Sequence, residues 1–201
     1  MARPSNTLER RRQIIAGLAN VMADVGYERA TIVAIARSAG LAPGLVHYHF
    51  GSKDDVLHAL LARVVDVARA RYQRRLEAAG TDAWGRLDAA IDALVALDDD
   101  ADVRAAACWI QIGVEAPRNP VIAAAYREAV IHQHAVLTTH VAEIRAVQNR
   151  SPEDASEVAA GIMSAIEGAF RLASSAPEVV PWGQTARLVR KMARGLLESA
   201  R

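Results

Sequence analysis

Three consecutive side chains, His47, Tyr48 and His49, concentrate polar aromatic chemistry in one short stretch. Two imidazoles can bind a metal ion, but on a helix residues i and i+2 point to different sides. The same side chains donate and accept hydrogen bonds, which suits them to base edges and phosphates. The spacing therefore favours contact with nucleic acid over a metal site.

The segment that must position these side chains, residues 31–53, predicts two short helices joined by a tight turn and followed by a long third helix. Thr31 is suited to cap the first helix, and Gly40 supplies the backbone freedom that the reversal needs. Pro43 fits the first position of the second helix. That helix is expected to bury Val46 and to leave its polar aromatic side free. This is the geometry of a helix that enters the DNA major groove, so the segment predicts a helix-turn-helix.

The motif is carried by Ile35, Ala36, Ala39, Gly40, Leu41, Gly44, Val46, His47, Tyr48, His49, Phe50, Ser52 and Lys53. Together they resemble the DNA-binding signature of TetR-family transcriptional regulators. The resemblance implies an N-terminal three-helix DNA-binding domain and a larger helical domain that dimerises and often binds a small ligand. Ala42 stands where the family often has Ser, which removes a side-chain cap. His47 stands where the family usually has Tyr, which leaves the base preference open.

Basic residues near this motif are candidates for phosphate contact. Residues 1–53 carry seven bases against three acids, whereas the whole chain has a net charge of +1. The run Arg10 to Arg12 is either a solvated face or a phosphate-binding one, and the nearby motif favours the second. Arg3 either reaches DNA or belongs to a disordered tail. The predicted contacts to a double-stranded DNA operator are Arg10, Arg11, Arg12, Thr31, Pro43, Gly44, Leu45, His47, Tyr48 and Lys53.

Other reactive side chains do not form a catalytic or metal-binding pattern. His132, His134 and His140 share one predicted helix without an i, i+4 pair, and Cys108 has no evident activating partner. An acidic run at residues 98–102 lacks the glycine and the distal Glu of a calcium loop, so a solvated loop is the better interpretation. The sequence therefore predicts no enzyme, no cofactor and no metal.

A second group of polar and aromatic residues could line a small-molecule pocket, although core packing explains each one equally well. Aromatic faces near a carboxylate suit a cation. The expected effector is therefore small and largely apolar, or cationic because of Glu115. The segment around Trp109 that ends in Glu-Ala-Pro-Arg-Asn-Pro also resembles the BetI-type C-terminal subgroup. The candidates are Trp109, Gln111, Glu115, Tyr126, His132 and Phe170.

The last two predicted helices carry apolar or small residues on more than one side. Ala160, Ser164 and Gly168 repeat at i, i+4 spacing, which allows close helix approach, and Val189 and Leu196 follow on the last helix. These five residues are the candidate dimer interface, as a four-helix contact between two subunits. Packing onto their own core is the alternative.

Bulk composition agrees with a helical protein. The chain has 201 residues, of which 52% are hydrophobic and only 4% aromatic, and it predicts an all-α fold of about nine helices. The expected domains are residues 1–53, which bind DNA, and 54–201, which bind the effector and dimerise. The predicted helices cover about 8–25, 31–39, 43–50, 52–79, 83–97, 103–116, 120–149, 152–175 and 184–201.

Function and location follow from these features. No signal peptide or long apolar span is expected, and a single cysteine suits the cytoplasm. We predict a homodimeric DNA-binding regulator, a repressor released by its ligand. A ligand-binding or enzymatic bundle with a degenerate helix-turn-helix, and an architectural DNA binder without a ligand, are the alternatives.

Overall fold

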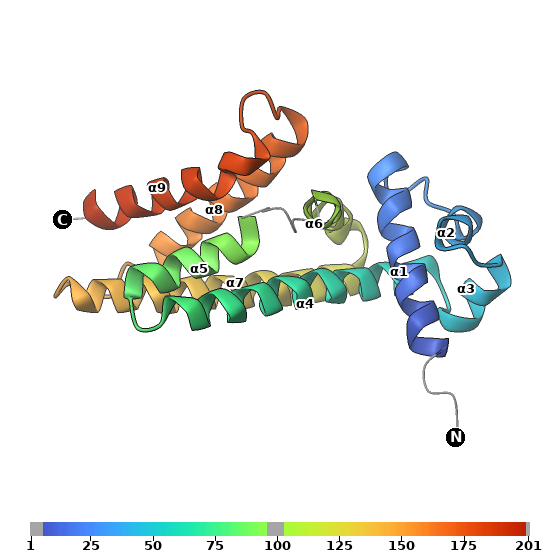
Figure 1. The fold of residues 1–201 in the computed structure, drawn as a ribbon, viewed down its shortest axis with the longest axis horizontal. Coiled ribbons are helices and arrows are strands. Elements are labelled where there is room, and N and C mark those ends of the chain that lie inside the picture. The colour runs from blue at the N-terminus through green and yellow to red at the C-terminus, as the bar shows by residue number, and fades with distance from the viewer. Residues whose placement is uncertain (1–5, 96–102, 200–201) are drawn as a thin grey trace, which may run out of the picture. The chain divides into compact units, whose positions relative to one another are not determined.

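The computed structural model describes residues 6–95 and 103–199, which contain helices and no strands (Figure 1). The α-helices are α1 (Asn6–Val25), α2 (Ile32–Ala39), α3 (Pro43–His49), α4 (Lys53–Ala79), α5 (Ala83–Val95), α6 (Val103–Glu115), α7 (Pro120–Val147), α8 (Ala155–Ser175) and α9 (Thr185–Ser199). Two 3-10 helices, η1 (Ala116–Arg118) and η2 (Trp182–Gln184), complete the elements. The predicted all-α fold with nine α-helices is confirmed for this part of the chain. Arg3 and the acidic run lie outside it.

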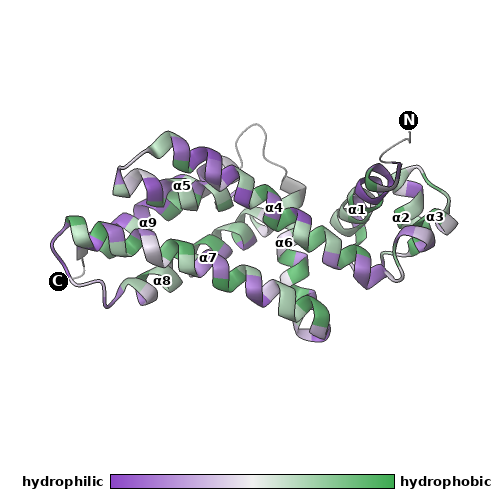
Figure 2. Cartoon of the chain, turned by 90° about the horizontal axis from the view of Figure 1, so that it is seen from below, coloured by the Kyte–Doolittle hydropathy of each residue, from purple (hydrophilic) through white to green (hydrophobic). Residues whose placement is uncertain are grey.

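The chain forms two compact units, and two of the three boundaries between them fall inside long helices, α4 and α7. Unit 1 comprises Met1–Val65 and Val103–Arg127, and unit 2 comprises Asp66–Asp102 and Glu128–Arg201. Hydrophobic and hydrophilic residues alternate along α4 and α7, as expected for helices with one packed face (Figure 2). The sequence-based division into domains at residues 53 and 54 does not coincide with these units. It concerns which part binds DNA and which binds an effector, and it stays a prediction.

The core of unit 1 joins α1 to the helix-turn-helix and to the first part of α4. Its fully buried side chains include Ile14, Leu18, Met22, Ile35, Ala36, Val46, Val56 and Leu57. Helices α1 and α2 lie close together at Gly17, where an added Cβ would lie 2.7 Å from the Ile35 carbonyl oxygen. A side chain there would push α2 away, so this glycine fixes the spacing that supports the turn.

Helix α6 belongs to unit 1 because it packs against α1. The Gln111 amide Nε2 donates to the Met22 carbonyl at 2.7 Å, near the carboxyl end of α1. The Arg118 guanidinium lies 3.5 Å from the Glu28 carboxylate. These contacts join segments far apart in sequence, which explains why the sequence pattern did not assign α6 to the N-terminal unit.

Unit 2 packs α5, α8 and α9 together with the remaining parts of α4 and α7. Its buried apolar side chains include Leu87, Ile91, Leu137, Val141, Ile144, Ile162, Ile166, Val189, Ala193 and Leu197. Arg145 is only 1% exposed. Its Nε donates to Asp154 at 3.0 Å, Nη2 also bonds Asp154, and Nη1 donates to the Leu197 carbonyl at 3.0 Å. This buried arginine ties the turn between α7 and α8 to the end of α9.

The same arginine explains a difference at the start of α8. The sequence predicts a helix from about Pro152, with Ser151 as its cap and Glu153 and Asp154 in its first turn, whereas α8 begins at Ala155. Asp154 makes no cap hydrogen bond there, because its carboxylate bonds Arg145 instead. Those bonds lower the pKa of Asp154.

Candidate nucleic-acid interface

Local sequence signals produce the turn between α2 and α3. The Thr31 hydroxyl accepts from the Ala34 N–H at 3.1 Å. Gly40 has a φ of 67°, in the left-handed region, and its N–H donates to the Arg37 carbonyl at 3.1 Å. Helix α3 begins at Pro43 without a side-chain cap, because Ala42 has no polar atom to offer. The predicted helix-turn-helix is thus confirmed, as is the expected absence of a side-chain cap at the start of α3.

Helix α3 has a buried back and an exposed front. Val46 is 0% exposed and Phe50, just after the helix, is 4% exposed, so both pack into unit 1. Tyr48 is 80% exposed and Leu45 is 39% exposed. His47 is exposed as well, as are Pro43 and Gly44. This arrangement presents polar, aromatic and apolar groups to a partner while the helix stays anchored.

The predicted cations near α3 divide into outward and inward groups. The side chain of Arg12 is 77% exposed and lies 3.9 Å from Glu9. Arg10 bonds Asn6 and Gln13 at 2.9 Å each, on the same helix. These two cations remain near the surface, where phosphates can approach.

Lys53 and Arg11 point into the protein. The Lys53 ammonium donates to the Tyr27 carbonyl at 3.0 Å and lies 4.1 Å from the centre of the Tyr27 ring. The Arg11 guanidinium donates to the His49 carbonyl and lies 3.9 Å from the centre of the Phe50 ring. Each cation therefore combines a backbone carbonyl with an aromatic face.

The start of α4 is held to the loop after α1 by a second contact. The Tyr27 hydroxyl bonds the Asp54 carboxylate, and Tyr27 is 8% exposed. Burial and this hydrogen bond raise the pKa of Tyr27. The phenol therefore stays protonated and able to donate throughout the physiological range. Sequence reasoning missed Tyr27 because its partner lies 27 residues away.

Two exposed cations were also missed. Arg29 lies in the loop before α2, and Arg37 lies in the last turn of α2. Both are exposed in unit 1, and both contribute to the basic excess of residues 1–53. The charge count was the signal that could have identified them.

Four of the six effector candidates lie in unit 1. The rings of Trp109 and Tyr126 meet with centroids 4.7 Å apart, and Trp109 is 5% exposed. An added Cβ at Gly113 would lie 2.9 Å from the Tyr126 hydroxyl, so this glycine leaves room for the tyrosine. The Glu115 side chain is 14% exposed and lies 3.8 Å from Arg118. Gln111 bonds α1, and its buried Oε1 has no hydrogen-bond partner within the described residues.

The other two candidates lie in unit 2. His132 is exposed on α7, and Phe170 is 6% exposed, with its ring 6.4 Å from that of Trp182. The structure groups neither of them with Trp109. Their role in ligand binding stays a prediction.

A buried polar chain in unit 2 was not predicted. The Tyr72 hydroxyl lies 2.6 Å from His140 Nε2, and His140 Nδ1 lies 2.9 Å from Glu143 Oε2. Arg86 Nε lies 3.2 Å from the same Glu143 oxygen, without hydrogen-bond geometry. Burial raises the pKa of Tyr72. These side chains connect α4, α5 and α7 within the unit.

The candidate dimer residues differ in exposure. Ala160 and Ser164 are exposed on α8, and an added Cβ at Gly168 would meet no atom within 4 Å. Leu196 is 44% exposed, whereas Val189 is 1% exposed and packs within its own chain. Leu172 and Met192 are also exposed, at 46% and 56%. The surface of α8 and α9 thus offers small and apolar side chains to a partner.

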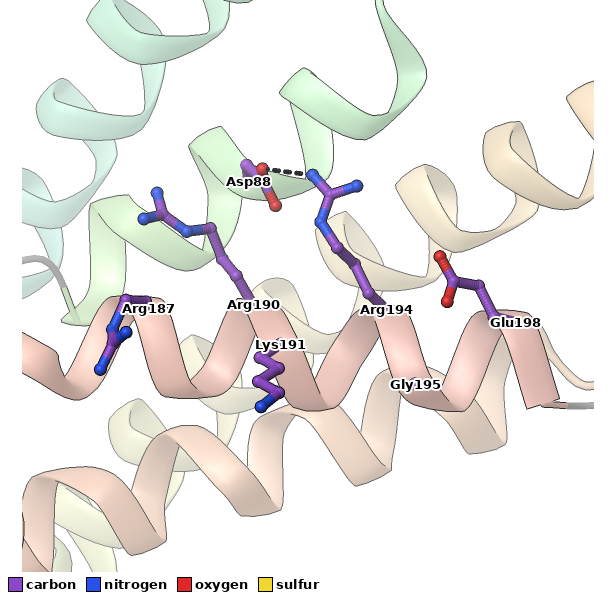
Figure 3. Close-up of a pocket in the computed structure, with 7 residues that line it drawn as sticks. All are labelled: Asp88, Arg187, Arg190, Lys191, Arg194, Gly195 and Glu198. Carbon is purple, nitrogen blue, oxygen red and sulfur yellow. Dashed lines mark hydrogen bonds and ion pairs between the residues drawn. The ribbon is translucent and has the colours of Figure 1, made fainter.

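A groove of about 610 Å³ runs between α5 and α9 in unit 2 (Figure 3). It is lined by Asp88, Arg187, Arg190, Lys191, Arg194, Gly195 and Glu198. Arg194 bonds Asp88 at 2.8 Å and lies over the Trp84 ring, and Arg190 bonds Asp92 at 2.6 Å. Arg190 and Arg194 therefore hold α9 to α5, and this role explains why two cations of α9 face the groove.

Residues 6–95 and 103–199 contain no cluster of three or more His, Cys, Asp or Glu that could hold a metal ion. Cys108 is 1% exposed, and its Sγ lies 3.9 Å from the Ala19 carbonyl oxygen. No helix in this part of the chain is long and apolar enough to cross a membrane.

A helix-turn-helix with an exposed recognition helix, joined to a larger helical bundle, defines a DNA-binding transcriptional regulator. Comparison with known proteins agrees. The family model "Bacterial regulatory proteins, tetR family" matches residues 14–60, and "BetI-type transcriptional repressor, C-terminal" matches residues 83–198. The chain belongs to the TetR family of transcriptional regulators and carries a BetI-type C-terminal region.

Individual relatives support the assignment. The chain is 28% identical over 162 residues to the transcriptional regulator BetI of Escherichia coli (strain K12), covering 79% of each chain. It is 38% identical over 74 residues to the regulator HbdR of Aromatoleum sp. (strain CIB), covering 37% of this chain and 32% of HbdR.

Solved structures show the same fold along almost the whole chain. A transcriptional regulator from Rhodococcus sp. Rha1 superposes with a TM-score of 0.81 at 26% identity, covering 94% of this chain and 97% of its own. A regulator from Saccharomonospora viridis in complex with choline gives a TM-score of 0.79 at 25% identity, covering 96% and 97%.

Proposed function

We propose that this regulator is a homodimeric repressor that a small organic cation releases from its operator. The observation that carries the proposal is the form of α3, which buries Val46 completely while Tyr48 stays 80% exposed. The BetI-type match supports repression as the outcome. A bacterial chromosome lies in the cytoplasm, so the proposal places the protein there.

In this proposal α3 enters the major groove and its exposed front contacts the bases. His47 and Tyr48 make hydrogen bonds there, and Leu45 contacts thymine methyl groups. Gly44 and Pro43 allow close approach of the backbone. Thr31, Arg10 and Arg12 supply phosphate contacts around the recognition helix. Arg11 and Lys53 were expected in the same set, but both point into unit 1. The inward position of Arg11 gives it a different role, argued below.

Dimerisation brings two recognition helices onto one operator. Ala160, Ser164 and Gly168 let α8 approach its symmetry mate, and Leu196 extends the contact on α9. Exposed Leu172 and Met192 support this choice, because single large apolar side chains on neighbouring helices gain from burial. The symmetric arrangement predicts an operator with two related half-sites.

The effector class follows from aromatic and acidic groups in unit 1. The Trp109 and Tyr126 rings lie against each other, and aromatic faces attract cations. Glu115 places a carboxylate on the same helix as Trp109. The choline complex of the Saccharomonospora viridis relative supports a quaternary ammonium as the first ligand to test.

Contact between α6 and α1 offers a route from effector to DNA. Gln111 caps the end of α1 from α6, two residues after Trp109. A ligand alters operator affinity only if it binds the two arrangements of the protein unequally. The coupling must also be reciprocal, so operator DNA must weaken effector binding by the same factor.

The experiment uses a DNA duplex selected by the wild-type protein from a randomised library. Its affinity is measured by fluorescence anisotropy with choline and with 3,3-dimethylbutan-1-ol, a neutral molecule of nearly the same shape. Choline should weaken operator binding by about 5- to 150-fold, and the neutral analogue should not.

Glu115→Gln supplies the matched control, because it removes a charge while keeping the side chain's size. Its response to choline should fall while operator affinity without ligand is retained. If choline binds the wild-type protein yet leaves operator affinity unchanged, release by this cation is refuted. An equal response to both molecules would refute recognition of the charge.

A further inference from the structure

We propose that Arg11 positions the recognition helix and thereby sets sequence discrimination, rather than neutralising a phosphate. Its guanidinium donates from Nη1 to the His49 carbonyl, at the carboxyl end of α3, and lies 3.9 Å from the centre of the Phe50 ring. The two contacts join α1 to the end of α3 across 38 residues of sequence. The proposal rests on the DNA-binding function of α3.

Helix α3 needs such support because it is short. Its seven residues span about 10 Å, and isolated helices of fewer than about 12 residues are marginal in water. No side chain caps its amino end, since Ala42 occupies the N-cap position. Tertiary contacts must therefore fix its position and keep its last turn from fraying.

The carboxyl end of α3 is where a guanidinium has the largest effect. The last four carbonyls of a helix have no partner within the helix, and they carry the negative end of its dipole. A hydrogen bond from a cation both pairs such a carbonyl and interacts favourably with the negative end of the dipole. The Phe50 N–H bonds the Val46 carbonyl, and Arg11 bonds the carbonyl of His49, the last residue of α3.

The Phe50 ring makes this contact directional. Phe50 is 4% exposed and is fixed in the core of unit 1, and Arg11 is itself half-buried. A planar guanidinium stacks on a ring and keeps donors in its plane, which an ammonium cannot do. Arg12, the next residue, has a side chain that is 77% exposed and makes no such contact with the described residues. Two neighbouring arginines of equal charge thus have different surroundings.

The two roles predict different thermodynamics. A residue that contacts a phosphate weakens binding to all sequences about equally when it is removed, and it lowers the salt slope by about one per contact. A residue that positions α3 weakens binding to the selected operator and leaves binding to unrelated DNA and the salt slope nearly unchanged. The ratio of specific to non-specific affinity separates the two.

The test compares Arg11→Gln, Arg11→Lys and Arg12→Gln in the full chain. Each variant is titrated with the duplex selected by the wild-type protein and with a scrambled duplex, over a series of salt concentrations. Arg11→Gln should lower the specific-to-non-specific ratio about tenfold or more and keep the salt slope. Arg11→Lys should restore little of that ratio, although it keeps the charge. Arg12→Gln should leave the ratio unchanged.

Hydrogen exchange without DNA provides a second measurement. Arg11→Gln should accelerate exchange of the Phe50 amide and of the last amides of α3, whereas Arg12→Gln should not. Circular dichroism at the assay temperature verifies that all variants are folded.

The inference is overturned if Arg11→Gln reduces the salt slope and weakens both duplexes equally, or if Arg11→Lys restores full discrimination. An unchanged ratio in Arg11→Gln overturns it as well. Failure of the DNA-binding function gives a different result, because the wild-type protein would then select no sequence from the library.

Discussion

The close contact between α1 and α2 at Gly17 gives a sharp test of the packing in unit 1. An added Cβ at Gly17 would lie 2.7 Å from the Ile35 carbonyl oxygen and 3.1 Å from the Ala39 Cβ. The backbone oxygen cannot rotate away as a flexible side chain can, so Gly17→Ala must push α1 and α2 apart. Overpacking of this kind costs about 1–3 kcal/mol. Replacing a helical Gly by Ala recovers up to about 1 kcal/mol through helix propensity.

At mid-range, a cost of about 2 kcal/mol less a recovery of about 1 kcal/mol leaves a loss of about 1 kcal/mol in the free energy of unfolding, which lowers Tm by about 2–4 °C for a chain of this length. Thermal melting followed by circular dichroism measures it. Gly44→Ala is the matched control, because an added Cβ there meets no atom within 4 Å. It should leave Tm unchanged or slightly raised. A Gly17→Ala protein as stable as the wild type would refute the packing argument.

Three further predictions concern DNA contact, a buried ion pair and assembly. Tyr48→Ala should weaken operator binding by about 1–3 kcal/mol in a titration without altering Tm, since Tyr48 is 80% exposed. Arg145 lowers the pKa of Asp154, so the Asp154 carboxylate stabilises the fold above its unfolded pKa of about 3.9 and loses this effect as the pH falls through the lower folded value. Asp154→Asn should cost about 1–3 kcal/mol in neutral urea melts, limited because its side chain is 37% exposed, and the difference should shrink below about pH 4. Gly168→Trp should shift sedimentation towards the monomer; a monomeric wild type at micromolar concentration would contradict the proposed interface.

Local signals explain why the helix-turn-helix could be predicted closely. The Thr31 cap, the left-handed Gly40 and the first-turn Pro43 each act within a few residues, so their effect is visible in the sequence. The turn after α7 is also local, with Asn149 at a φ of 55°. Predicted helices therefore differ from the observed ones mainly at their ends. The exposed side of α3 could be predicted as well, because the helical spacing of its apolar and polar residues is a short-range pattern.

Partners of polar side chains could not be predicted in this way. The pairs Gln111 with Met22 and Tyr72 with His140 are 89 and 68 residues apart. Sequence patterns indicated that these residues were polar or aromatic, and no pattern indicated which distant group they meet. The same applies to Asp154, which was expected in the first turn of α8 and instead bonds Arg145. Periodicity therefore predicts which face of a helix is buried, whereas the partner of a polar side chain depends on how the helices pack.

Helix α1 takes part in two of the distant contacts of unit 1. Near its carboxyl end the Met22 carbonyl accepts from Gln111 of α6, and near its amino end Arg11 donates to His49 of α3. A helix of 20 residues is about 30 Å long and its internal hydrogen bonds keep it stiff. A shift of α6 that displaced the end of α1 would therefore reach the carboxyl end of the recognition helix through one rigid element. In that arrangement a modest rearrangement around α6 changes how α3 meets the bases, while exposed cations such as Arg12 keep their place at the surface. Effector binding should then reduce sequence discrimination more than it reduces attraction to DNA in general.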